Sequence, residues 1–134
     1  MTTKTKLIIG RILTGLVGLF MIGASGLPKF MDYPGKAEQM AKLQLPDSLL
    51  ATVAVIEIAV TVIYLIPRAA FLGAILVTAY LGGAVWTHLR IGEPWFFPII
   101  IGVLAWTGLA LRQPSILALA LGRFPSPDQT KPAA

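Results

Sequence analysis

Four long apolar stretches limit what this chain can fold into more than any other feature of its sequence. Each contains about 17–20 residues, the length that an α-helix needs to cross roughly 30 Å of hydrocarbon. Only two charged residues, Arg11 and Glu57, interrupt them. We therefore predict an all-α fold, a bundle of four transmembrane helices over residues 7–26, 49–66, 69–86 and 95–111.

The alternative is a water-soluble bundle, in which each helix would carry a polar stripe at a spacing of 3.6 residues. The last three apolar stretches show no such stripe. Of the 134 residues, 56% are hydrophobic and 13% are charged, whereas soluble domains contain about 25% charged residues. The composition therefore favours the lipid bilayer as the environment of the chain.

The Lys and Arg residues lie at the ends of the apolar stretches rather than on one face, so we expect no nucleic-acid partner. If the spans alternate in direction, seven of these residues fall on the side of the two termini and four on the other. Cytoplasmic segments carry the excess of Lys and Arg, so both termini are predicted to be cytoplasmic. A cleavable signal peptide, suggested by Lys4, Lys6 and residues 24–26, is the alternative for the first stretch. Its apolar run is long for such a signal, and we interpret it as a retained span.

Residues 27–47 form the longest segment between spans. Within it, residues 34–43 place Ala37, Met40 and Ala41 on one helical face and charged side chains around the other. This pattern predicts a short helix in the outer membrane interface. We expect residues 1–122 to form a single membrane domain and residues 123–134 to form a disordered tail.

Small residues predict how the spans pack, because lipid provides no hydrophobic drive between helices. The first span carries Gly10, Thr14, Gly18 and Gly26 along one stripe, and the third span is rich in Gly and Ala. We expect both to form contact faces. The fourth span has fewer small residues and is expected to be more exposed to lipid.

Ionisable residues inside a membrane are costly and are therefore candidates for function. Glu57 lies near the middle of the second span, with Thr61 one turn further on the same face. It is either a proton-handling residue or a structural one, protonated or paired with a buried cation. Arg11 either snorkels to the lipid phosphates or reaches inward to Glu57. A depth difference of about 8–10 Å between these two residues favours snorkelling.

The outer half of the bundle collects polar residues that suit one binding pocket. His88, the only histidine, ends the third span and is suited to proton transfer near neutral pH; a solvated surface position is the alternative. For Lys29, the alternative to a role in the pocket is that of a membrane anchor. Trp86 belongs to an aromatic belt or to a stacking platform. We predict Glu57 and His88 as catalytic residues and, as ligand-binding residues, Ser25, Lys29, Tyr80, Trp86 and Arg90.

The chain contains no cysteine. We therefore expect no cofactor held by thiolates, whether zinc or an iron–sulfur cluster. One histidine with scattered carboxylates falls short of the three or four ligands of a zinc site, so no metal site is expected. A pocket with an apolar floor and few polar groups suits an amphiphile with a polar head, such as a quinone, a sterol or a fatty molecule.

At these positions the sequence resembles the DoxX-like family of bacterial four-helix membrane proteins. The resemblance covers about residues 8–111 and is most specific in residues 80–90, Tyr-Leu-Gly-Gly-Ala-Val-Trp-Thr-His-Leu-Arg. Arg11, residues 26–30 and Glu57 with residues 65–68 add weaker support. The resemblance implies the four-span fold and a location in the bacterial cytoplasmic (inner) membrane.

Relatives implied by this resemblance include a subunit of thiosulfate:quinone oxidoreductase and partners in membrane redox complexes. This chain has no cysteine to handle sulfur, which argues against the thiosulfate chemistry of that relative. Our leading hypothesis is an accessory or quinone-interacting subunit of a membrane redox system, which implies a redox-enzyme partner. The alternatives are a stand-alone membrane enzyme that acts on a lipophilic substrate by acid/base chemistry, and a non-catalytic scaffold or carrier. An oligomer is compatible with each of them.

Overall fold

The computed structural model describes residues 1–124, and these form helices joined by short loops. The first helix begins with α1 (Thr3–Gly18) and continues through a π-helical segment, η1 (Leu19–Gly26), into a 3-10 turn, η2 (Leu27–Phe30). The remaining elements are α2 (Lys36–Leu43), α3 (Asp47–Leu65), α4 (Ala70–Arg90), α5 (Phe96–Arg112) and α6 (Pro114–Ala120). The predicted interfacial helix is therefore present as α2.

The predicted all-α, four-helix architecture is confirmed. Three helical segments, residues 3–30, 47–65 and 70–90, are long and apolar enough to cross a membrane. The fourth span is α5, which has 17 residues and is followed by α6 after a bend of 116°. The short helix α6 is not expected from the sequence. The predicted tail, residues 123–134, lies outside the described residues apart from its first two positions.

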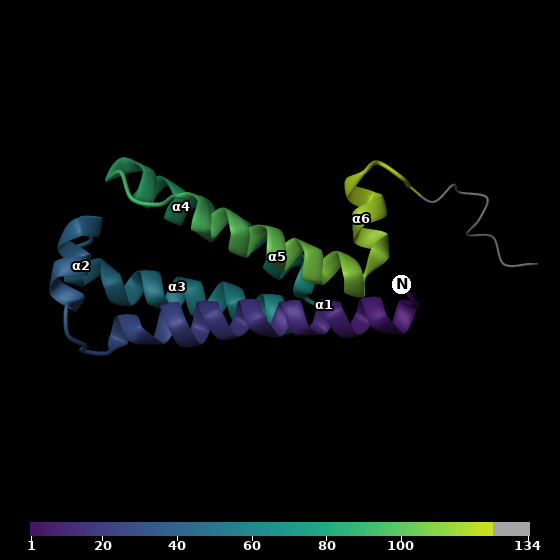
Figure 1. Cartoon of the computed structure of the whole chain (residues 1–134), viewed down its shortest axis with the longest axis horizontal. Helices are drawn as coiled ribbons and strands as arrows, with labels where there is room; N and C mark the ends of the chain where they lie inside the picture. Colours follow the sequence, from purple (N-terminus) through teal and green to yellow (C-terminus); the bar gives the residue numbers. More distant parts are fainter. Residues whose placement is uncertain (125–134) are drawn as a thin grey trace, which may run out of the picture.

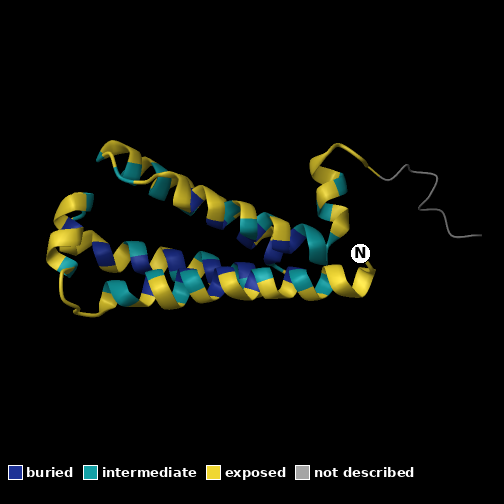
Figure 2. Ribbon diagram, viewed as in Figure 1, coloured by how far each residue is buried: buried dark blue, intermediate teal, exposed yellow. Residues whose placement is uncertain are grey.

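The four long helices form a ring in which each packs against two neighbours. The N-terminal half of the first helix packs against α5, and η1 packs against α3, while α4 contacts both α3 and α5. Figure 1 shows that the α1–α3 pair and the α4–α5 pair lie closest near the N-terminus and separate toward α2. Exposed positions cover the outer faces of the helices (Figure 2), as expected where a bundle meets lipid.

Small residues permit the closest approaches between helices. A Cβ atom on Gly73 would lie 2.2 Å from the Tyr64 backbone, so the α3–α4 hairpin needs glycine at this position. The predicted stripe on the first helix is confirmed, because Gly10, Gly18 and Gly26 each face another segment at contact distance.

The expectation that the fourth span is more exposed to lipid is wrong. Five residues of α5 are buried, as many as in α3 and in α4. The reason is local, since Ala105 and Gly108 lie where α5 meets the other helices. A few small residues at the point of contact are sufficient to bury one face of α5, even though the whole span contains few of them.

Tyr64 joins three helices in the core. Its hydroxyl donates to the Ala105 carbonyl at 2.8 Å and lies 3.3 Å from the Thr14 hydroxyl. Because its side chain is completely buried, these bonds satisfy a polar group that would otherwise cost free energy in an apolar interior. This core fills the half of the bundle nearest the N-terminus and leaves the Glu57 region as the polar part of the interior.

Candidate functional site

Glu57 is the only charged residue that is buried among those described, with 2% of its surface exposed. It occupies the middle of α3, on the face that also buries Ala54 and Thr61. The apolar residues on both sides make α3 a transmembrane helix, and the position of Glu57 within it points the carboxylate at the first helix and at α4.

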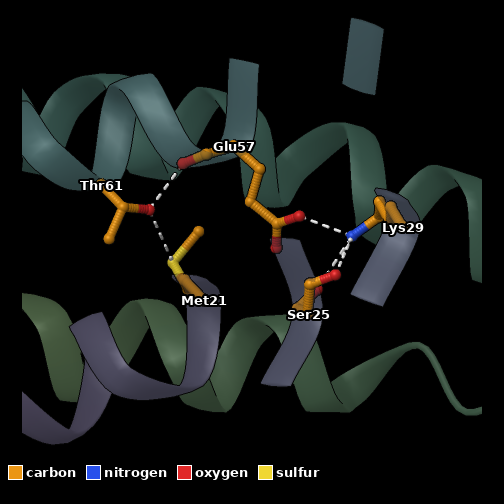
Figure 3. Close-up of polar contacts among 5 residues, drawn as sticks. All are labelled: Met21, Ser25, Lys29, Glu57 and Thr61. Carbon is orange, nitrogen blue, oxygen red and sulfur yellow. Dashed lines mark hydrogen bonds and ion pairs between the residues drawn. The ribbon is translucent and has the colours of Figure 1, made fainter. Parts of the chain in front are cut away.

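Lys29 is the partner of Glu57 (Figure 3). Its ammonium nitrogen lies 2.5 Å from a Glu57 carboxylate oxygen, and it also donates to the Ser25 carbonyl at 2.9 Å and to the Ser25 hydroxyl at 3.0 Å. Only 16% of the Lys29 side-chain surface is exposed. All three donors of the ammonium group are therefore used inside the protein.

The unusual backbone of the first helix brings these groups together. Residues 19–26 are π-helical and residues 27–30 form a 3-10 turn, and the side chains of Ser25 and Lys29 meet within this segment. At Gly26 the chain approaches α3 so closely that a Cβ atom would lie 2.8 Å from Ile58. π-helical turns are rare in proteins, and those that do occur are frequently found at functional sites.

Two further side chains, Thr61 and Tyr80, complete this cluster. The Thr61 hydroxyl donates to the Glu57 carbonyl at 2.6 Å and approaches the Met21 sulfur at 3.8 Å. On the other side, the Tyr80 hydroxyl of α4 is near enough to the Glu57 carboxylate to interact with it electrostatically. We call Ser25, Lys29, Glu57, Thr61 and Tyr80 the Glu57 cluster.

The Glu57 carboxylate is paired with a half-buried cation, and that cation is Lys29 rather than Arg11. Arg11 is exposed on the outside of α1, as the snorkelling interpretation expects. Lys29 lies on the interior side, against Glu57 of α3, rather than at the lipid surface where the alternative of a membrane anchor would place it.

His88 and Arg90 lie apart from this cluster, so the structure does not form the single pocket expected from the sequence. His88 is eight residues beyond Tyr80, which is about 12 Å along the axis of α4. It lines a cavity of about 300 Å³ together with Gly35, Glu38, Gln39, Lys42, Leu43 and Glu93.

Arg90 connects α4 to the interfacial helix. Its guanidinium donates to the Leu43 carbonyl at 3.2 Å. The Nδ1 atom of His88 is buried and has no hydrogen-bond partner within residues 1–124. Sequence reasoning missed Glu38 and Glu93 as neighbours of His88, because nothing in the linear pattern showed that α2 would fold against the end of α4.

Trp86 is 67% exposed on the outer surface of α4. This placement matches an aromatic belt facing lipid. The neighbouring Trp95 and Phe96 rings meet edge to face with centroids 6.5 Å apart. Among residues 1–124, no group of three or more His, Asp or Glu side chains is arranged to hold a metal ion.

Residues 12–108, which contain both polar regions, match the DoxX-like family. The chain belongs to the DoxX-like family. It is a membrane protein with several spans, and the matched segment runs through the first helix, α2, α3, α4 and most of α5. No curated protein and no solved structure matches the sequence.

Proposed function

We propose that this DoxX-like protein is a membrane subunit that binds the polar head of a quinone-like amphiphile at the Glu57 cluster, working with a redox-enzyme partner. The observation that carries the proposal is the Lys29–Glu57 ion pair inside the spans, in which the carboxylate is buried and the ammonium half-buried. Ionisable groups at such positions mark ligand pathways and proton relays in membrane proteins.

The residues of the cluster fit the chemistry of such a head group. Tyr80 supplies a hydrogen-bond donor for a carbonyl oxygen, and Glu57 supplies an acceptor for a hydroxyl, while Lys29 holds the Glu57 carboxylate in place. A bound quinone would supply two-electron, two-proton redox chemistry, with the electrons provided by the partner. Within this chain, Glu57 holds or releases a proton at its carboxylate oxygens, and Lys29 compensates the charge.

A cytoplasmic membrane of a bacterium is the proposed setting, with both termini on the cytoplasmic side. The distribution of Lys and Arg supports this orientation. The Glu57 cluster would then lie in the outer half of the bilayer. This location matches an amphiphile that enters from the lipid phase and presents its head group to the ion pair.

The direct test is retention of quinone by the purified full chain in native lipid, measured by mass spectrometry. We expect the wild type to retain quinone and Glu57→Gln to lose most of it, because Gln keeps the shape and an oxygen acceptor for Lys29 but carries no charge. Thr52→Ala is the matched control, because Thr52 is exposed on the same helix. Equal retention by wild type and Glu57→Gln, with both folded, would contradict the proposal.

One observation favours a second candidate function. The cavity that contains His88 also contains Glu38 and Glu93, an arrangement that suits acid/base catalysis on a lipophilic substrate at the interface. His88→Ala separates the two candidates. If the protein is a quinone-binding subunit, we expect His88→Ala to retain as much quinone as the wild type. If His88→Ala instead loses the turnover of a lipophilic substrate while it still retains quinone, the result would favour the enzyme.

A further inference from the structure

The two ends of the bundle differ in charge. The end that carries the N-terminus is held together by Gly10 against Arg112 and Gly108, and by the Gln113 amide donating to the Pro67 carbonyl at 3.3 Å. We call it the basic end, and its charged residues within 1–124 are all cations, namely Lys4, Lys6, Arg11, Arg68, Arg112 and Arg123.

The acidic residues of the described chain all lie elsewhere. They belong to the loop before α2, to α2, to the first turn and middle of α3, and to the loop before α5; they are Asp32, Glu38, Asp47, Glu57 and Glu93. Within residues 1–124 the Lys29–Glu57 contact is the only ion pair. The cations of the basic end are therefore not neutralised by carboxylates of that part of the chain.

Arg112 adds a second observation at this end. Its Nε atom donates to the Gly108 carbonyl at 3.3 Å, while its Nη2 atom is buried without a hydrogen-bond partner inside the described residues. A buried cationic donor of this kind is costly unless an acceptor reaches it. Phosphate oxygens are strong acceptors for guanidinium groups.

The helix α6 gives this end an apolar surface. It turns through 116° after α5, which is more than a right angle, so it runs across the bundle and slightly back along it (Figure 1). Leu117 and Leu121 are 51% and 63% exposed. A mostly apolar groove of about 270 Å³ follows the helix, lined by Ser115, Ile116, Ala118, Leu119 and Arg123.

We propose that α6 and the basic end form a binding site for an anionic phospholipid. An acyl chain lies in the groove beside Leu119, and the phosphate faces Arg123. Lipid fits better than a soluble acidic partner, because α6 presents exposed leucines beside the cations and its direction keeps them at the membrane. The site is separate from the Glu57 cluster and does not depend on the proposed quinone function.

The test compares phosphatidylglycerol with phosphatidylcholine of the same acyl chains, bound to the purified full chain and measured by native mass spectrometry. We expect wild type to prefer phosphatidylglycerol and Arg123→Gln to reduce that preference about fivefold, the effect of one interfacial cation. Leu119→Ser should weaken binding of both lipids. Glycerol phosphate without acyl chains should not compete.

Arg68→Gln is the matched control, because it removes one exposed cation from the same end but lies outside α6. It should reduce the preference less than Arg123→Gln. A wild type without preference, equal effects of the two variants, or competition by glycerol phosphate would each overturn the proposed site. Circular dichroism of every variant shows whether the fold is kept, and quinone retention should be unchanged in all of them.

Discussion

The polar middle of the bundle and the basic end use cations in opposite ways. In the middle of the bundle and at the end that carries α2, three of the four cations have hydrogen-bond partners within the protein. Lys29 binds Glu57 and Ser25, Lys36 donates to the carbonyls of Lys29 and Met31 at 3.1 and 2.7 Å, and Arg90 donates to Leu43. At the basic end, Arg112 is the only cation with a side-chain hydrogen bond among residues 1–124, to the Gly108 carbonyl, and no cation there meets a carboxylate.

Lys and Arg residues therefore have different roles in different regions of one membrane bundle. A cation that is held by carbonyls and a carboxylate is a positioned part of the interior, and its removal leaves another group without a partner. A cation that faces lipid phosphates interacts with the environment, and its removal changes membrane contacts more than folding. Two predictions about stability and one about exposed charge follow from this comparison, in addition to the ligand and lipid tests.

The largest expected effect is that of Glu57→Ala. It leaves the Lys29 ammonium buried without its carboxylate, which costs roughly 3–5 kcal/mol of unfolding free energy for a buried pair. Thermal or denaturant unfolding in detergent measures the loss. The double variant Lys29→Met, Glu57→Met should recover most of it, because two apolar groups replace the pair. A double variant as unstable as Glu57→Ala would show that the pair is not the origin of the effect.

A smaller effect is expected at Gly26. A methyl group there would lie 2.8 Å from Ile58 and 2.9 Å from the Met21 carbonyl, so Gly26→Ala should destabilise the protein by about 1–3 kcal/mol through overpacking. Gly23→Ala is the matched control in the same π-helical segment, where the nearest atom is 3.6 Å away. We expect Gly23→Ala to be neutral or slightly stabilising. Equal losses in both variants would mean that the close approach of η1 to α3 does not position Lys29.

The smallest effect on folding is expected for Lys4→Gln and Lys6→Gln. Both residues are exposed at the basic end, and such surface substitutions change stability by less than about 0.5 kcal/mol. Their loss should instead weaken the preference for the proposed orientation with cytoplasmic termini. Labelling of an engineered terminal cysteine in intact cells measures this orientation. A large loss of stability in these variants would remove the contrast between the two regions.

Much of the fold was predictable because it depends on local patterns. The four spans, the short helix α2 and the contact stripe of the first helix follow from apolar length and from the spacing of small residues. The helix α6 was not predicted, since Pro114 directly after Gln113 shows only that the preceding helix ends. Its direction depends on packing against α5.

For the candidate site, the sequence identified the residue types and the structure identified the neighbours. Glu57, Lys29, Ser25 and Tyr80 were predicted for one pocket, and the structure brings these four together. His88 and Arg90 were placed in the same pocket, whereas they lie about two turns further along α4 and face α2. The catalytic and ligand-binding roles of all these residues stay predictions.

The sequence alone determined that the chain is a multi-span helical membrane protein, because the length of an apolar run and the cost of charge in hydrocarbon are properties of single segments. It also determined the difference in charge between the two ends. Only the tertiary structure decided which cation Glu57 meets, because that depends on how the end of the first helix packs against α3. The tertiary structure likewise decided which residues surround His88, because that depends on how α2 folds against the end of α4.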